Sequence, residues 1–437
     1  MAANAQRILL ILALAAAGCG RATLTPTAAG PSLTPTSAAA SASGTVIDTP
    51  SATPPGENLL TAPAPTAGTP TSTASPAPSA TVNPFLPTAT ALPPTAAPPQ
   101  SLTAANAVSV TLLAAFGPGL LISGTEGVTG TVPANVRLEQ VVWGPGEGQV
   151  AVAGAAGVLV YDRATGALAQ RIVTSAWATS LALWPEGHAL AAGTVNATVE
   201  VYDTRDGELR ALLNGPGVQV AQVRYVPVPG SVLPAGYAVA SLGVNNTLHW
   251  WDVALQAYLG PLTLGPSPAQ RVDWSERAPF GRQWLAAAAG NVVSVWALPT
   301  LLEAAPAFDA VPPTRELAQP APLTTLALSA DGHWLAAANT GGTILIWDLS
   351  DPSAPPQALA RQAYPAEALA FSPSGDLLAA AHGDRLVRLW AVDGGAQPLA
   401  ALAGPSDRIT SVAFSPDGRE LAATGWEGVV RVWGIAD

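Results

Sequence analysis

The 437-residue sequence contains no lysine, only one cysteine and only four histidines. A single cysteine excludes any disulfide bond within the chain. A metal site needs three or four converging ligands, and the histidines are widely spaced along the sequence, at His188, His249, His333 and His382. We therefore expect neither a metal site nor a cofactor. No Gly-x-Ser-x-Gly motif marks a nucleophilic serine either.

Charge is also scarce, and most of it is negative. Charged residues make up 11% of the chain, the formal net charge is −11, and every basic residue is an arginine. The two arginines before residue 105 are balanced by Asp48 and Glu57, so the whole net charge belongs to the rest of the chain. Binding to phosphate backbones demands clustered positive charge. Nucleic acid is thus not an expected partner.

The chain lacks an apolar run long enough to cross a bilayer. Residues 8–17 are apolar but too few, and Gly117, Pro118 and Gly119 interrupt the apolar stretch at 104–122. One positive charge, a short apolar run and then small residues predict a secretory signal peptide over residues 1–18. The residues that end this run, 16–19, resemble a bacterial lipobox with alanine in place of the usual leucine. That resemblance implies lipidation of Cys19; simple cleavage after a small residue is the alternative.

Residues 19–104 have a composition of their own. Proline, threonine, alanine and serine make up nearly all of this segment, and large apolar residues are sparse. Such a segment cannot bury enough surface to offset the entropy lost on ordering. We expect a disordered tether that begins at Cys19 and is stiffened by its prolines.

Seven copies of one pattern fill residues 105–437. In the last copy an alternating run around Val412 and Phe414 meets a Ser-Pro-Asp-Gly turn, and two further apolar runs follow, the last ending at Trp433. This pattern predicts three short strands joined by tight turns. The copies end in an aromatic residue every 40–50 residues or so, at Tyr161, Tyr202, Trp251, Trp296, Trp347, Trp390 and Trp433.

A repeat of this length with several strands predicts an all-β fold, a seven-bladed β-propeller of four-stranded antiparallel blades over residues 105–437. The last copy ends soon after its third strand and lacks a fourth. An open edge between the first and last blades would be a liability. We therefore expect an N-terminal strand, from residues 108–113 or 120–123, to complete the last blade and close the ring.

The aromatic–aspartate pairs at 161–162, 202–203, 251–252 and 347–348, with the turn at 415–418, resemble those of the WD-repeat β-propeller family. The resemblance covers about the last three-quarters of the chain. It implies that the loops between blades and the turns between second and third strands form a face that receives peptides and proteins. The Gly-His pair that normally precedes each repeat is absent, so the family's Trp–Ser–His–Asp network cannot form. Asp384 and Glu427 hold the acidic turn position, where we expect structural hydrogen bonds.

Alignment of the repeats places candidate binding residues on that face. The candidates on second turns are Asn339, His382 and Trp426, and those before first strands are Trp177, Tyr364 and Arg408. Aromatic residues and arginine dominate binding hot spots. Trp177 and Trp426 are therefore the principal candidates; packing on a neighbouring blade or lining the central channel is the alternative.

The sequence as a whole predicts a non-catalytic protein–protein interaction scaffold. We expect a monomer, held outside the cytoplasmic membrane by its lipid anchor alone, with an unidentified protein partner on one propeller face. Two alternatives stay open. One is a propeller that binds envelope glycans through its aromatic residues. The other is a hydrolase or lyase, which would need two channel carboxylates within about 10 Å of each other.

Overall fold

A computed structural model describes residues 101–117, 136–144, 148–184, 187–215, 217–227, 237–253, 256–264, 269–275, 283–304 and 308–435. The predicted signal peptide, Cys19 and the predicted tether up to residue 100 lie outside the described residues. Within the described ranges, no helix is both long and apolar enough to span a membrane.

The described residues form seven four-stranded antiparallel sheets, which are the blades of a β-propeller. The first strands of the blades are β2 (Leu138–Trp143), β6 (Ala178–Leu183), β10 (Val220–Pro227), β14 (Ala269–Trp274), β18 (Leu323–Leu328), β22 (Ala366–Phe371) and β26 (Ile409–Phe414). The second strands are β3 (Gln149–Gly154), β7 (Ala189–Thr194), β11 (Tyr237–Gly243), β15 (Trp284–Ala289), β19 (Trp334–Asn339), β23 (Leu377–His382) and β27 (Glu420–Gly425). The third strands are β4 (Gly157–Asp162), β8 (Thr198–Asp203), β12 (Thr247–Asp252), β16 (Val292–Ala297), β20 (Ile344–Asp348), β24 (Val387–Ala391) and β28 (Val430–Ile435). The fourth strands are β5 (Leu168–Ile172), β9 (Leu209–Asn214), β13 (Ala257–Thr263), β17 (Arg315–Ala318), β21 (Gln357–Ala358), β25 (Ala400–Leu402) and, from the N-terminal side, β1 (Val110–Phe116).

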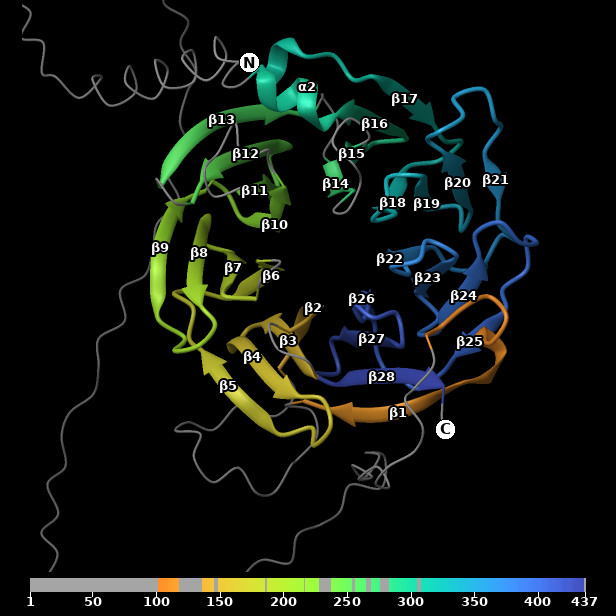
Figure 1. The fold of residues 1–437 in the computed structure, drawn as a ribbon, viewed down its shortest axis with the longest axis horizontal. Helices are drawn as coiled ribbons and strands as arrows, with labels where there is room; N and C mark the ends of the chain where they lie inside the picture. The colour runs from red at the N-terminus through yellow and green to blue at the C-terminus, as the bar shows by residue number, and fades with distance from the viewer. Residues whose placement is uncertain are drawn as a thin grey trace, which may run out of the picture. The chain divides into compact units, whose positions relative to one another are not determined.

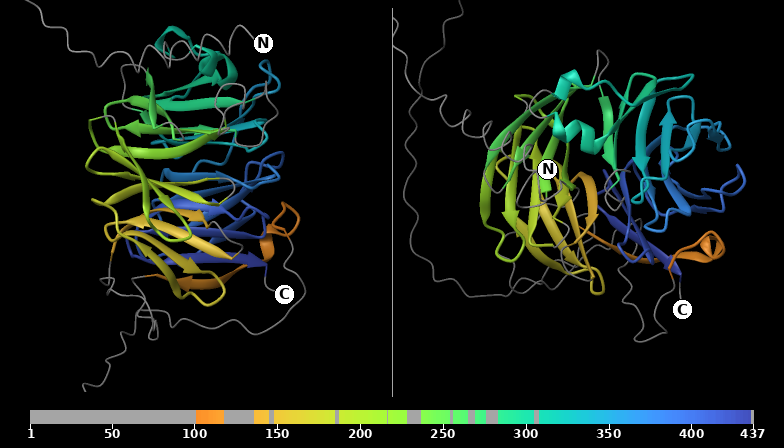
Figure 2. Two further views of the ribbon diagram at one scale, coloured as in Figure 1. Left: turned by 60° about the vertical axis from the view of Figure 1, so that its left-hand side comes forward. Right: turned by 45° about the horizontal axis from the view of Figure 1, so that its top comes forward.

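The first strand of each blade lies nearest the axis of the ring and the fourth lies at the rim (Figure 1). We number the blades 1 to 7 in the order of these first strands, β2 to β26. The ring seen from two further directions confirms that successive blades stand side by side (Figure 2). The predicted fold, seven four-stranded blades in a ring, is confirmed.

The hydrophobic core is divided among the seven junctions between neighbouring blades. Each apolar cluster joins residues of two adjacent blades, for example Ala379 and Leu402 of blade 6 with Trp433 of blade 7. The second strands supply alanines, such as Ala336 and Ala380, that are completely buried. Small side chains let the sheets approach closely, while the large aromatic at the end of each third strand fills the remaining space.

The ring is closed by β1, as the sequence predicts. This strand pairs with β28 in antiparallel register, from Val110 opposite Ile435 to Phe116 opposite Val430, and it lies beside β28 at the rim (Figure 1). Of the two segments expected to supply the strand, 120–123 lies outside the described residues. Pairing of β1 with the C-terminal strand leaves blade 7 with the same four strands as the others.

Every first strand shifts its register with the second strand after its first residue, which is the signature of a β-bulge. At three of these bulges a threonine hydroxyl donates to the first carbonyl of the next blade. These bonds run from Thr179 to Val220 (2.6 Å), from Thr324 to Ala366 (2.6 Å) and from Thr410 to Leu138 (2.8 Å). The bulges therefore fasten neighbouring blades next to the axis.

Blade 4 carries an insertion between its third and fourth strands. It contains the short helix α2 (Leu298–Glu303) and the 3₁₀ turn η2 (Phe308–Ala310). The Asp309 carboxylate accepts a hydrogen bond from the Thr263 amide (2.6 Å), so the insertion covers the outer edge of β13 in blade 3. A second 3₁₀ turn, η1 (Ala107–Ser109), leads into β1.

Candidate functional site

Two kinds of connection meet on one side of the ring. Because the strands of each blade are antiparallel, the turn from second to third strand lies on the same side as the loop from fourth strand to the next blade. We call this side the loop face. It is formed by the loops 173–177, 359–365 and 403–408, the turns 339–343, 382–386 and 426–429, and the equivalent connections of the other blades.

The indole of Trp426 lies at the centre of a charged cluster on this face. Two guanidinium carbons lie over its ring, that of Arg137 at 4.3 Å from the centroid and that of Arg408 at 5.0 Å. Cations placed over an aromatic face are attracted by the ring quadrupole. Trp426 is half-buried, whereas both arginines are exposed. Its indole N–H is buried and has no acceptor within the described residues.

Two carboxylates of the innermost strands flank this cluster. Arg408 is ion-paired through Nε with Glu367 of blade 6, and Glu139 of blade 1 interacts electrostatically with Arg137 and Arg408. Both glutamates occupy the bulge position of their strands. Burial raises the pKa of Glu139 above its ordinary value, although the two arginines oppose this shift. The cluster thus joins blades 1, 6 and 7 close to the axis.

Tyr364 extends the loop face on blade 6, and 52% of it is exposed. It lies against Gly383, where an added Cβ would stand 3.5 Å from the Tyr364 Cβ. The neighbouring His382 is buried, and its Nδ1 lies 3.0 Å from the Tyr364 carbonyl oxygen. Burial lowers the pKa of His382, so the neutral ring donates from Nδ1 to that carbonyl. His382 therefore lies beneath the face and holds the loop that carries Tyr364.

Asn339 also lies beneath the face, with only 1% of its surface exposed. Its Nδ2 donates to the Gln319 side chain (2.7 Å), and its Oδ1 accepts from the amides of Gly341 (2.9 Å) and Thr343 (3.2 Å). The sequence places Asn339 at a turn correctly. Its side-chain amide, however, is hydrogen-bonded to Gln319 and to the backbone of its own turn, so it is not offered to a partner. Like His382, it supports the face from below.

The two turn acids each hold an arginine four residues later. Asp384 accepts two hydrogen bonds from Arg388 (2.6 and 3.0 Å) and one from the Leu386 amide (3.2 Å). Burial acts to raise the pKa of Asp384, but the Arg388 hydrogen bonds and charge outweigh it and lower that pKa. Glu427 forms a buried ion pair with Arg431 and accepts from Ser406. We call this second set the Ser406–Glu427–Arg431 clasp.

Trp177 occupies the loop before β6 in blade 2, at the position that Arg408 holds in blade 7. It is half-buried, and its indole N–H is buried with no acceptor within the described residues. It stands one blade beyond Arg137 and is not part of the Trp426 cluster. The structure thus brings together Trp426 and Arg408, with Tyr364 on the same blade as Glu367, and leaves Trp177 apart.

Three members of the cluster were missed by sequence reasoning: Arg137, Glu139 and Glu367. A signal for each exists in the aligned repeats. Arg137 immediately precedes the first strand of its blade, as Arg408 and Trp177 do. Glu139 and Glu367 occupy the second position of a first strand, where Thr179, Thr324 and Thr410 stand in other blades. A charged residue at the second position of a first strand therefore indicates a charged group close to the axis.

The described residues do not meet the requirements of a metal site. Among those residues no group of three or more histidine, cysteine, aspartate or glutamate side chains is arranged to hold a metal ion. The charged groups of the Trp426 cluster make ionic and cation–π contacts with one another.

Comparison with known proteins agrees with this architecture. Residues 312–348, 365–391 and 396–434 match the family described as WD domain, G-beta repeat. These stretches contain the first three strands of blades 5, 6 and 7. The small ribosomal subunit protein RACK1y of Oryza sativa subsp. japonica is 29% identical over 167 residues, which are 38% of this chain and 45% of that protein. The chain therefore matches less than half the length of this relative. It is a seven-bladed β-propeller whose fifth, sixth and seventh blades are similar to WD repeats.

Proposed function

We propose that this propeller is a non-catalytic protein-interaction scaffold whose partner binds the loop face around Trp426. The observation that carries the proposal is the position of Arg137 and Arg408 over the Trp426 ring. Arg408 is also ion-paired with Glu367, and both arginines attract Glu139. Partly exposed tryptophan and arginine are the side chains most enriched among binding hot spots. Arg137 donates no hydrogen bond to a described residue, so its guanidinium is available to a partner.

The comparisons support the same class of function. WD repeats occur in propellers that act as interaction platforms. The rice relative is named as a ribosomal subunit protein, and therefore as a component of a larger assembly. Only that general role is carried over here: we propose an assembly partner for this chain, without assigning it to the ribosome.

The arrangement of the acids favours binding over catalysis. Glycoside hydrolysis requires two carboxyl groups with different protonation states on either side of a substrate. Glu367 is already ion-paired with Arg408, and the same arginine attracts Glu139. With both carboxylates engaged by one guanidinium, we propose that they orient Arg408 toward a partner.

We further propose that the scaffold works outside the cytoplasmic membrane as a monomer, anchored through lipidated Cys19 and extended by the Pro/Thr-rich tether. This part of the proposal is supported by the sequence alone. Radiolabelled palmitate fed to cells that express the full chain should label it, and Cys19→Ser should abolish the label. Labelling that persists in Cys19→Ser would contradict the anchor. External protease should digest the chain in spheroplasts that keep a cytoplasmic marker intact.

The binding face is tested with the full chain as bait in envelope extract, by crosslinking and mass spectrometry. One protein should be captured by the unchanged chain and by a Leu112→Ala control, since Leu112 is exposed on β1 at the rim. Trp426→Ala should lose about tenfold in capture or more, as expected for a hot-spot residue. Capture that is unaffected by Trp426→Ala would overturn the loop face as the site. Retention of glycan in place of protein would favour the glycan-binding alternative.

A further inference from the structure

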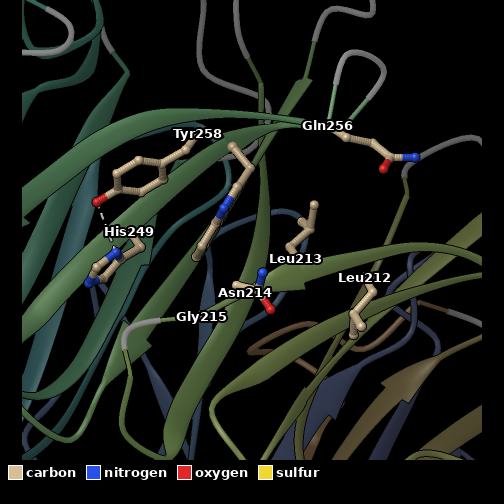
Figure 3. A pocket seen from close by; sticks show the side chains of 8 residues that line it. Leu212, Leu213, Asn214, Gly215, His249, Gln256 and Tyr258 are labelled. Atoms are coloured by element: carbon tan, nitrogen blue, oxygen red, sulfur yellow. Dashed lines mark hydrogen bonds between the residues drawn. The ribbon is translucent and has the colours of Figure 1, made fainter. Parts of the chain in front are cut away.

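A pocket opens at the rim of the ring, far from the Trp426 cluster along the chain, between blades 2 and 3 (Figure 3). Its volume is about 440 Å³. We call it the rim pocket; its lining includes Leu212, Asn214, His249, Trp251, Gln256 and Tyr258. The first two belong to β9 of blade 2, and the others belong to or adjoin β12 and β13 of blade 3. The proposed scaffold function makes no use of it.

The repeat explains why a pocket exists at this junction. At the junction of blades 6 and 7 the Ser406–Glu427–Arg431 clasp fills the same place, and the Arg431 Cδ lies 3.0 Å from where a Cβ on Gly404 would stand. The aligned residues at the junction of blades 2 and 3 are Gly217, Asn245 and His249. The serine hydroxyl, the carboxylate and the long guanidinium side chain are thus all replaced by smaller or shorter groups.

Two described residues of the loop above the rim pocket, Gly215 and Gly217, have no side chain to cover it. Gly215 aligns with Gly404, and a Cβ on it would lie 2.2 Å from the Ala197 carbonyl oxygen, so no side chain fits there. Gly217 has a positive φ of 74° and nothing within 4 Å of a would-be Cβ. These two glycines therefore leave their side of the pocket uncovered.

The floor of the rim pocket is an aromatic cluster in which the partly exposed rings of His249 and Tyr258 rest on Trp251, only 3% of which is exposed. The His249 ring stacks on Trp251 (5.9 Å between centroids) and on Tyr258 (5.6 Å), and Trp251 lies 5.8 Å from Tyr258. The Tyr258 hydroxyl and His249 Nδ1 are 3.0 Å apart and are joined in Figure 3. Burial lowers the pKa of His249, so the imidazole is neutral at pH 7. None of the six lining residues named above then carries a charge.

Apolar and amide side chains complete the lining. Leu212 is 52% exposed and Tyr258 51%, so both offer apolar surface to a ligand. Asn214 and Gln256 are exposed and offer amide donors at the margin. An uncharged groove of aromatic rings with a few hydrogen-bond donors is the chemistry that recognises polyproline II segments. Such segments form no internal hydrogen bonds and leave their carbonyls free.

We propose that the rim pocket binds the Pro/Thr-rich segment of this same chain, residues 20–100. That segment is rich in proline and contains only Arg21, Asp48 and Glu57 as charged residues, which matches the uncharged pocket. It joins the propeller at Ser101, and about 80 residues at ~3.1 Å each in a polyproline II helix reach roughly 250 Å, more than enough to reach any blade. Covalent attachment raises its local concentration, so weak contacts suffice for docking.

This docking is independent of the partner proposed for the loop face. The docking proposal and the scaffold proposal are therefore tested independently, because substitutions in the rim pocket leave the loop face unchanged.

The test places the photo-crosslinker p-benzoylphenylalanine at Leu212 in the full chain. A mixture of unlabelled and ¹⁵N-labelled protein distinguishes crosslinks within one chain from crosslinks between two copies. We expect crosslinked peptides from residues 20–100 of the same chain. The same crosslinker at Tyr364, which is equally exposed on the loop face, should give about tenfold fewer of them. Crosslinks only to propeller residues, to a second copy, or to no peptide would overturn the proposal.

Two variants separate docking from mere proximity. Tyr258→Ala in the Leu212-labelled chain removes part of the aromatic cluster and should lower the yield about tenfold, whereas Tyr258→Phe keeps the ring and should retain most of it. Because Tyr258 is half exposed, both variants should fold, which circular dichroism verifies. An excess of synthetic peptide with the sequence of residues 84–100 should compete, and the same peptide with its prolines replaced by alanine should not. A yield unchanged by both Tyr258→Ala and the competitor would overturn the proposal.

Discussion

Arg163 of blade 1 and Glu420 of blade 7 form an ion pair across the point where the ring closes. Arg163 Nε lies 2.7 Å from Glu420 Oε2, and Nη2 pairs with the other carboxylate oxygen. Both side chains are largely buried, with 15% and 12% exposed. On the same junction Trp143 Nε1 donates to the Ala413 carbonyl (2.9 Å). Closure therefore uses side-chain contacts between blades in addition to the β1–β28 pairing.

We predict that Arg163→Met destabilises the propeller by about 1–3 kcal/mol, because it leaves the Glu420 carboxylate buried without its cation. Burial already raises the pKa of Glu420, while Arg163 opposes that shift. The double variant Arg163→Met with Glu420→Gln should recover part of the loss, since no buried charge is left unpaired. Denaturant unfolding measures all three proteins.

Asp417→Asn provides the control for this cycle. Asp417 is 56% exposed and the Arg419 guanidinium is 3.6 Å away. Its Oδ1 accepts from the Ser415 hydroxyl and the Arg419 amide, and the oxygen of asparagine can keep both bonds, so the change should stay within about 0.5 kcal/mol. A double variant that is less stable than Arg163→Met would contradict the role assigned to this pair.

Phe116 at the end of β1 anchors the closing strand. It is 1% exposed, packs on Tyr161 with ring centroids 5.3 Å apart, and belongs to the apolar cluster between blades 1 and 7. Phe116→Ala should cost about 3–5 kcal/mol, the range for truncating a buried aromatic. Leu112→Ala on the same strand removes a 46% exposed side chain and should cost less than 1 kcal/mol or so. Equal losses in thermal unfolding would show that β1 does not close the ring through its apolar face.

The architecture could be predicted from the sequence because it depends on local patterns. Strand alternation, turn residues and the aromatic at each repeat end, such as Trp390 and Trp433, recur at regular spacing, and the missing fourth strand of the last copy predicts closure by an N-terminal segment. These patterns can be recognised without knowing which residues far apart in the sequence are in contact. The result is a correct count of blades and a correct closure by an N-terminal strand, which overlaps the first of the two segments that the sequence offered.

The side-chain environment of the face could not be predicted in the same way. The position of Asn339 and His382 in turns indicated exposure, but their burial depends on how the loops around Gln319 and Tyr364 pack over them. The Trp426 cluster requires Arg137, some 290 residues away in sequence, and such a contact leaves no local pattern. The one sequence signal for Arg137 is its position immediately before a first strand, which it shares with Arg408 and Trp177.

The Ser406–Glu427–Arg431 clasp places a charged pair in a largely buried environment. Arg431 and Glu427 have only 5% and 9% of their side chains exposed. Burial lowers the pKa of Arg431 to about 10, which leaves it charged at neutral pH. Glu427→Gln should therefore leave a buried cation without its anion and cost about 3–5 kcal/mol. Asp384→Asn in blade 6, where the pair is more exposed, should cost less; the reverse order in denaturant unfolding would contradict the assignment.

The sign of the pH dependence of stability shows whether burial or the two arginines dominate the pKa of Glu139. Burial raises its pKa in the folded state above the ordinary value of 4.5, so the folded protein holds this proton more tightly than the unfolded chain. The stabilisation linked to protonation is fully present below the unfolded pKa and is lost as pH rises through the folded pKa. Glu139→Gln removes this titration and should therefore be more stable than the unchanged protein at pH 7, by less than about 1 kcal/mol.

That advantage of Glu139→Gln should shrink as pH falls toward 4, where the native carboxyl is itself neutral in the folded state. Denaturant unfolding of both proteins across this range measures the difference. Glu303→Gln, which makes the same substitution at an exposed glutamate on α2, serves as the matched control. If the advantage of Glu139→Gln instead grows at low pH, the attraction of Arg137 and Arg408 outweighs burial, and Glu139 acts as a stabilising counter-ion for the two arginines of the loop face.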